Sequence, residues 1–142
     1  MQQFTTLVNP GISIPPSATS VNHITNHMLA SAPGEKDAFS QLVTFLGDAL
    51  DGKIIMCAHN ATFDFNFLSN TLSRLGYSAT IQYVDTLNLA RKYIHYVPNY
   101  KQSTLEQHLG LTNPTAHRAS TDAENCGKIL CHILDSIILE SL

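Results

Sequence analysis

The chain has 142 residues, 44% of them hydrophobic, and this length suits one domain with an ordinary buried core. Eight Lys and Arg against eleven Asp and Glu give a net charge of −3, so nucleic-acid binding would need a local site rather than general basicity. No apolar run is long enough to span a membrane, and the first residues lack a signal-peptide pattern. Three cysteines without Cys-x-x-Cys spacing make no disulfide framework, so we expect a cytoplasmic protein.

The first third of the chain predicts a strand, a long loop and a helix. Residues 4–8 form a short apolar strand that ends at an Asn-Pro-Gly turn. Residues 12–34 contain three prolines and many small polar residues, which predicts a loop with one short helix between Val21 and Leu29. Residues 36–50 carry apolar side chains at the spacing of an amphipathic helix.

The middle of the chain alternates strands and helices. Residues 54–58 are a continuous apolar run, which predicts a strand buried on both faces of a sheet. Residues 61–75 repeat apolar positions at intervals of four and three, which predicts a helix that Gly76 ends. Residues 81–84 predict another strand, and Asp-Thr then precedes a helix through Tyr93.

Two further helices complete the pattern. Residues 104–109 predict a short helix with a Thr-x-x-Gln capping box, and residues 119–139 predict a long one. The order of elements predicts an α/β fold with at least two crossover units. Three short strands are few for so many helices, so the sheet looks incomplete.

Two junctions between predicted elements are rich in polar side chains. Asn60 and Asp64 lie four residues apart, so they share a face near a helix N-terminus. His117 and Asp122 flank the start of the last helix, where both can face one cleft. Carboxylates with an imidazole alongside are typical of metal-assisted hydrolysis. An Asp in a first helical turn also stabilises the helix dipole without any catalytic role, so spacing alone leaves both interpretations open.

Several motifs together resemble the DEDDh 3′–5′ exonucleases, the group that includes the proofreading subunit of bacterial DNA polymerase. His-Asn-Ala-Thr-Phe-Asp at 59–64 resembles the second motif of the family, and His-Arg-Ala-x-x-Asp-Ala at 117–123 resembles the third. Asp-Thr-Leu-x-Leu-Ala-Arg at 85–91 resembles a further family segment. The stretches at 4–10 and 21–25 resemble the early strand and the segment against the terminal nucleotide, so the resemblance covers nearly the whole chain.

This resemblance implies a ribonuclease-H-like mixed sheet flanked by helices, and hydrolysis from a single-stranded 3′ end of DNA or RNA with two divalent ions, Mg²⁺ or Mn²⁺. By position, Asp64 and Asp122 are metal-binding acids and His117 is the general base. An imidazole with a pKa near ~6.5 suits that role. The resemblance is also compatible with a DNA polymerase as a partner, and it implies no association with a membrane. The expected contacts with the last nucleotides are Val21, Asn22, Asn60 and Phe63.

The chain departs from the family at its first motif. The family's Asp-x-Glu on its first strand is missing, and no Asp or Glu precedes Glu35. We therefore interpret residues 1–142 as a partial exonuclease domain that runs from the third strand of the family to its final helix. We expect this chain by itself to be inactive, because the missing carboxylates are principal metal ligands of the family.

Two alternative functions stay open. One is a catalytically dead module that binds nucleic acid or a polymerase. Another is a thiol hydrolase, because Cys57 and His59 share a face of a predicted strand, although a Cys in an apolar run is typical of a core. The pair His23 and His27 lacks further ligands for a metal site. A basic, aromatic stretch fits either a phosphate backbone or an ordinary surface; it comprises Arg91, Lys92, Tyr93, Tyr96, Tyr100 and Lys101.

Overall fold

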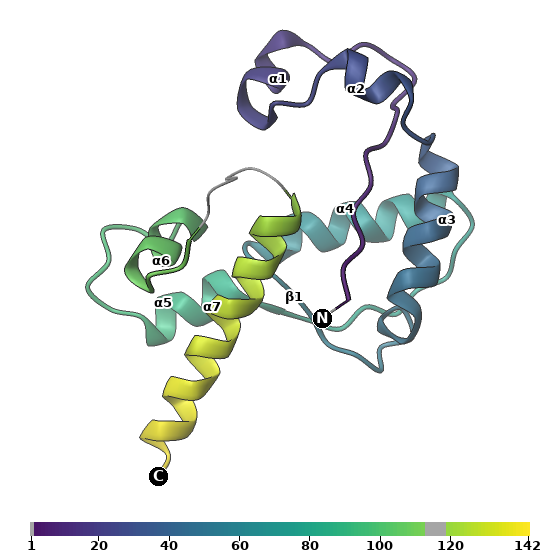
Figure 1. Cartoon of the computed structure of the whole chain (residues 1–142). Coiled ribbons are helices and arrows are strands. Elements are labelled where there is room, and N and C mark those ends of the chain that lie inside the picture. Colours follow the sequence, from purple (N-terminus) through teal and green to yellow (C-terminus); the bar gives the residue numbers. More distant parts are fainter. Residues whose placement is uncertain (1, 113–118) are drawn as a thin grey trace.

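The computed structural model describes residues 2–112 and 119–142 (Figure 1). These residues form a two-stranded sheet surrounded by helices. The strands are β1 (Met56–Ala58) and β2 (Tyr83–Asp85). The helices are α1 (Pro16–Asn22), α2 (Asn26–Ala30), α3 (Glu35–Leu46), the 3₁₀ turn η1 (Gly47–Ala49), α4 (Ala61–Arg74), α5 (Thr86–Tyr93), α6 (Gln102–His108) and α7 (Ala119–Glu140). No helix in the described ranges has the length and apolar character needed to cross a membrane.

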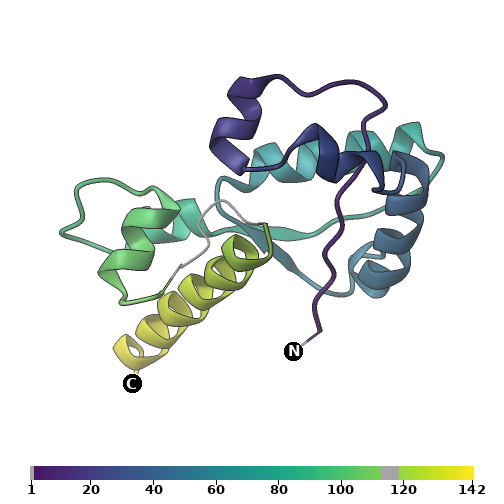
Figure 2. The same ribbon diagram turned by 45° about the horizontal axis from the view of Figure 1, so that its top comes forward.

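The sheet lies between two helical layers. β1 and β2 pair in parallel, with Cys57 opposite Val84 and Ala58 opposite Asp85. Helix α4 is the crossover between them and covers one face, while α7 packs on the other face against β1 (Figure 2). This is the arrangement of an α/β fold, so the predicted fold class is confirmed.

Helix α4 buries one apolar stripe, which packs against the sheet and, near the end of the helix, against α3. Ala61, Phe65 and Leu72 recur at intervals of four and seven residues, and each is buried, as the sequence pattern predicts. Leu72 packs with Phe39 of α3 in a second apolar cluster at the edge of the molecule. The Arg74 guanidinium also donates two hydrogen bonds to the Glu35 carboxylate, which joins the end of α4 to the start of α3.

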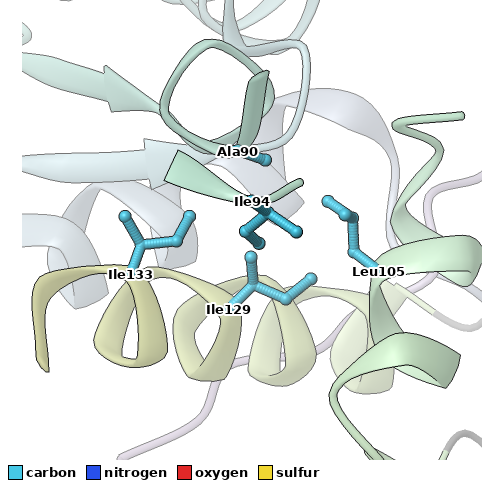
Figure 3. Packing of buried hydrophobic residues seen from close by; sticks show 5 residues of the cluster. All are labelled: Ala90, Ile94, Leu105, Ile129 and Ile133. Atoms are coloured by element: carbon cyan, nitrogen blue, oxygen red, sulfur yellow. The ribbon is translucent and has the colours of Figure 1, made fainter. Parts of the chain in front are cut away.

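The main core lies among α5, α6 and α7. It contains side chains that point toward one another from these three helices and from the turn after α5 (Figure 3). Ile129 and Leu105 have no exposed surface, and Ile133 has 1%. The buried members of this core are Ala90, Ile94, Leu105, Ile129 and Ile133.

The predicted strand at residues 4–8 is wrong. This segment runs as an extended trace without a strand partner among the described residues, and an isolated bridge follows it, between Asn9 and Gly34 (Figure 1). Phe4 stacks on Phe45 of α3 at 5.6 Å, and residues 2–6 line a cavity of about 470 Å³ that they share with the start of α7. An extended segment becomes a strand only when a neighbour supplies the ladder hydrogen bonds, and here a cavity replaces that neighbour. The structure therefore has one crossover unit in its described part, not the two expected.

The predicted strand at 54–58 is shorter and less buried than expected. Pairing begins at Met56, and Ile54 and Ile55 are 54% and 62% exposed. A run of apolar residues is buried on both faces only inside a wider sheet, and β1 pairs with β2 alone among the described strands.

Two smaller predictions also need correction. The loop at 12–34 contains two short helices rather than one, because His23 adopts a left-handed conformation that ends α1 before α2 begins. The capping box at Thr104 is wrong, since α6 begins two residues earlier. The Thr104 hydroxyl donates to Asn99 Oδ1 at 2.7 Å instead.

Candidate functional site

The two parallel strands end side by side, and the carboxylate of Asp85 accepts hydrogen bonds from the segments that follow both strands. Asp85 lies opposite Ala58 in the sheet. Its Oδ1 accepts a hydrogen bond from the Asn60 N–H at 3.0 Å and another from the Leu87 N–H at 2.9 Å. Asp85 thus caps α5 and also fixes the entry into α4. The carboxyl ends of parallel strands are where open α/β sheets place ligands.

Asn60 makes the sharp turn from β1 into α4. Its φ of 66° and ψ of 49° lie in the left-handed region, which Asn tolerates better than most residues with a side chain. The turn presents the first residues of α4 at the end of the strands. Phe63 is 74% exposed there, and Asp64 occupies the next position.

Asp64 lies in an acidic and partly desolvated environment. Burial raises the pKa of Asp64, and the nearby carboxylate of Asp85 raises it further, while a hydrogen bond with its own backbone acts in the opposite direction. The charge of Asp64 also contributes to a raised pKa of the Cys126 thiol on α7. Asp122 lies four residues before Cys126. Asp122 therefore lies on the face of α7 that carries Cys126.

The buried hydroxyl of Thr86 and the imidazole of His59 form hydrogen bonds near the ends of the two strands. Thr86 has no exposed surface, and its Oγ1 lies 2.9 Å from His59 Nδ1, 3.2 Å from the Ala58 carbonyl and 3.5 Å from Cys126 Sγ. His59 Nε2 lies 2.7 Å from the Tyr100 carbonyl, which only accepts, so this nitrogen carries the hydrogen. His59 therefore ties the end of β1 to the segment before α6.

Sequence reasoning missed the roles of Asp85, Thr86 and His59. The signal available was the pair Asp-Thr directly before a predicted helix, a pattern typical of an N-cap. The cap on α5 follows from it. The second contact of Asp85, to the Asn60 backbone, depends on the two strands being neighbours, which local sequence does not specify.

The other predicted residues lie on separate elements. Val21 and Asn22 end α1, with Val21 59% exposed. The Asn22 Oδ1 accepts from the Ile24 N–H at 2.9 Å, so it stabilises its own turn. His117 lies outside the described residues. The position of Asp122 is fixed in part by its carbonyl, which accepts a hydrogen bond from Gln102 Nε2 at 2.7 Å.

The described residues supply oxygen donors but no complete metal site. Across 2–112 and 119–142, three or more His, Cys, Asp or Glu side chains nowhere converge as a metal-binding group. His23 and His27 therefore belong to no metal-binding group of three or more such side chains among these residues. Carboxylates are the donors that Mg²⁺ prefers, yet this ion binds weakly unless several converge. Asp64 and Asp122 fit such a site in type and fall short of it in number.

Comparison with known families decides the identity. Residues 1–130 match the RNase_T family, described as Exonuclease. The chain belongs to this exonuclease family. Its resemblance to the DEDDh 3′–5′ exonucleases is thereby confirmed.

Relatives of this exonuclease domain include replication proteins. A DNA polymerase III of PolC type from Oceanobacillus iheyensis is 31% identical over 97% of this chain and 9% of its own length. A DNA polymerase III subunit epsilon from Treponema pallidum is 34% identical over 87% of the chain and 57% of its own length. A 3′–5′ exonuclease DinG from Bacillus subtilis is 29% identical over 96% of the chain and 14% of its own length. The chain thus spans only part of each relative.

A solved structure supports the fold independently. Exonuclease X, in complex with 5′ overhanging duplex DNA, superimposes with a TM-score of 0.65 over 92% of this chain and 71% of that one. The sequence identity is 24%, so this likeness speaks for the fold alone. The ribonuclease-H-like architecture expected for the exonuclease domain is confirmed.

The thiol-hydrolase alternative finds no support in the described site. Both ring nitrogens of His59 have partners, Thr86 and Tyr100, and neither is Cys57. The Cys57 thiolate accepts a hydrogen bond from the Cys126 thiol, which lowers the pKa of Cys57 to about 7. Cys126 itself is buried. Within the described residues Cys57 has a thiol neighbour rather than a general base.

We expect alkylation of Cys57 by iodoacetamide to rise to half its maximal rate near pH 7, because the thiolate is the nucleophile and its pKa is lowered. Peptide mass mapping at a series of pH values measures this rate. The reference is Cys126→Ala, which removes the hydrogen-bond donor and should move the Cys57 profile to higher pH. An unchanged Cys57 profile in this variant would contradict the assigned contact.

Proposed function

We propose that the complete domain to which this chain belongs is a 3′–5′ exonuclease that hydrolyses nucleotides from the 3′ end of single-stranded nucleic acid. The observation that carries the proposal is the family match over residues 1–130. The motif resemblance at 59–64 and 117–123 would make Asp64 and Asp122 two of the family acids. The environment of Asp64 agrees with it. A carboxylate crowded by Asp85 and by partial burial gains from a bound cation.

Each residue has a proposed role. Asp64 and Asp122 hold divalent ions, Mg²⁺ or Mn²⁺, together with acids from the family's first motif that residues 1–142 lack. When bound, such ions stabilise negative charge on the attacking and leaving oxygens. His117 accepts the proton of the attacking water.

Nucleotide binding is assigned to exposed side chains around the start of α4. Phe63 offers an aromatic face that is 74% exposed, and stacking on such a face is tolerant of base sequence. Asn60 supplies amide donors and acceptors at the end of β1. From α1, Val21 and Asn22 would complete the contacts with the last nucleotides. This set also explains how an acidic chain holds an anionic strand without general basicity.

A DNA polymerase is the proposed partner. Two of the relatives are named DNA polymerase III, one of PolC type and one a subunit epsilon. The chain covers 9% of the first and 57% of the second, so in each the matching domain is one part of a larger protein. We propose the same association for this domain.

The second candidate is a binding module without hydrolysis. It is favoured by the finding that, in the described ranges, no three metal-binding side chains converge. Such a module would keep the cleft and its nucleotide contacts. The two candidates differ in one measurable property, the release of 3′-terminal nucleotides.

We expect the 142-residue chain to bind Mg²⁺ weakly and to leave a 3′-labelled oligonucleotide intact, because two acids alone hold a hard cation poorly. We also expect it to self-associate, since Ile54 and Ile55 are exposed beside a strand with one described partner. An oligonucleotide assay and light scattering test both points.

The comparison is a chain extended at its N-terminus by a family-type segment with the Asp-x-Glu strand. That chain should be monomeric and should release nucleotides in Mg²⁺ and not in EDTA. A monomeric 142-residue chain that degrades the oligonucleotide would overturn the account of the missing motif. An extended chain that binds the oligonucleotide without cleaving it would favour the binding module.

A further inference from the structure

A cavity of about 590 Å³ lies at the ends of the strands, on the side of α5 and the segment before α6. Its walls include Asn60 after β1, Leu87 and Arg91 of α5, and Tyr100 and Lys101. Two of these residues are cationic, and no described lining residue is acidic. The cavity shares Asn60 with the candidate site, and none of its other lining residues is assigned above to the terminal nucleotide.

Both cations of this cavity lie among the described basic residues without a carboxylate partner, a property that they share with Lys36 and Lys92. Three basic side chains form ion pairs, namely Lys53, Arg74 and Lys128. Arg91 and Lys101 form none within the described residues. The chain has only eight Lys and Arg, so two unpaired cations around one cavity concentrate positive charge that the net charge of −3 conceals.

The wall that carries Lys101 is held in place by hydrogen bonds. The Asn99 Oδ1 accepts from the Lys101 N–H at 3.0 Å and from the Thr104 hydroxyl at 2.7 Å. The Tyr100 carbonyl accepts a hydrogen bond from His59 Nε2 at 2.7 Å, and the Tyr100 hydroxyl donates one to the Ile94 carbonyl at 3.0 Å. The segment is therefore ordered before any ligand binds, which lowers the entropic cost of binding.

We propose that this cavity binds a backbone phosphodiester of the nucleic-acid strand, upstream of the nucleotide that is removed, with Arg91 and Lys101 as the phosphate ligands. This proposal rests on the proposed function, because the word upstream assumes that the 3′ end of the strand lies at the candidate site. A guanidinium donates two hydrogen bonds to phosphate oxygens, and an ammonium adds a point charge. Leu87 and the ring of Tyr100 offer apolar surface for a sugar or base beside the phosphate.

The test is binding of a fluorescent single-stranded oligonucleotide in EDTA, measured by anisotropy at several salt concentrations. Binding is measured for the 142-residue chain and for its extended version, and the measurement does not depend on hydrolysis because EDTA is present. We expect Arg91→Gln with Lys101→Gln to weaken binding about tenfold at low salt and to reduce the slope of log affinity against log salt by about 0.7, the value for one phosphate contact on a single strand.

The matched control is Lys92→Gln. Lys92 follows Arg91 on α5, but it lies over the ring of Tyr93 at 5.0 Å and does not line the cavity. It should change the slope little. An equal loss with Lys92→Gln would overturn the proposal, because the effect would then be one of general charge. Equal weakening of polyglutamate binding by the double variant would also overturn the proposal.

The outcome separates this proposal from the function on which it rests. If the extended chain cleaves its substrate and the double variant binds as the parent does, the subsite is wrong and the exonuclease assignment stands. If binding depends on Arg91 and Lys101 while no chain cleaves, the subsite stands and the assignment falls. Absence of oligonucleotide binding by both unsubstituted chains at low salt overturns the subsite.

Discussion

Asp122→Asn in the extended domain is expected to lower the rate of 3′-end hydrolysis by at least about 100-fold. The amide keeps the size of the side chain and loses the negative charge with which the resemblance assigns Asp122 to cation binding. The carbonyl of Asp122 still accepts from Gln102, so the start of α7 should stay in place. The free energy of unfolding should change by less than about 1 kcal/mol, the size of a helix-dipole contribution. A 3′-labelled oligonucleotide assay and urea denaturation measure the two quantities.

The control variant is Asp135→Asn, which removes the same charge from an exposed position farther along α7. It should retain the parental rate, and a near-parental rate in Asp122→Asn would contradict the third-motif assignment. His117→Ala in the same domain separates the roles further. It should depress the rate, leave oligonucleotide binding intact and remove the acidic limb of the pH–rate profile. An unaltered profile would mean that another group accepts the proton.

Ile129→Ala is expected to reduce the free energy of unfolding by about 3 kcal/mol, the usual cost of removing a buried aliphatic side chain and leaving a cavity. Ile129 has no exposed surface and points at the core among α5, α6 and α7 (Figure 3). Loss of its contacts therefore loosens the helix that carries Asp122. Urea denaturation of the extended domain, followed by circular dichroism, measures the change.

Ile138→Ala is the matched comparison because Ile138 lies on the same helix and is 59% exposed. The same substitution there should cost less than about 1 kcal/mol. Equal losses at both positions would show that helix propensity, and not burial in the core, determines the effect. A loss in Ile129→Ala below about 1 kcal/mol would contradict the position of this core.

The helices were predictable because their apolar positions repeat within each segment. The stripe of α4 follows from spacing alone and is confirmed. The spacing also predicts α7 as a helix, but its buried residues are Asn125, Cys126, Ile129 and Ile133, while the apolar Leu134 and Ile138 are exposed. The strands were less predictable, because pairing depends on distant neighbours. Residues 4–8 have the composition of a strand, but the neighbour that would pair with them is not among the described residues. The same dependence explains the exposure of Ile54 and Ile55.

The site divides in the same way. Local motifs predicted Asn60, Phe63 and Asp64 near the start of α4, and in the structure Asn60 precedes the helix as its N-cap while Phe63 and Asp64 lie in its first turn. The contacts of Asp85 with the Asn60 backbone and of His59 with the Tyr100 carbonyl join residues 25 and 41 positions apart. Such pairs arise only when β1 and β2 lie side by side, so no window of sequence predicts them. The catalytic roles of Asp64, Asp122 and His117 stay predictions.

The left-handed turn at Asn60 has a consequence for how this sequence can drift. Single-nucleotide changes of an Asn codon lead to Asp, His, Lys, Ser, Thr, Tyr or Ile, and not to Gly, the residue most at ease in that conformation. The β-branched replacements are the most strained there. Asp tolerates the backbone but would add a third carboxylate beside Asp64 and Asp85. Mutational paths through this position are therefore narrow, and glycine is reached only by two nucleotide changes that pass through Asp or Ser.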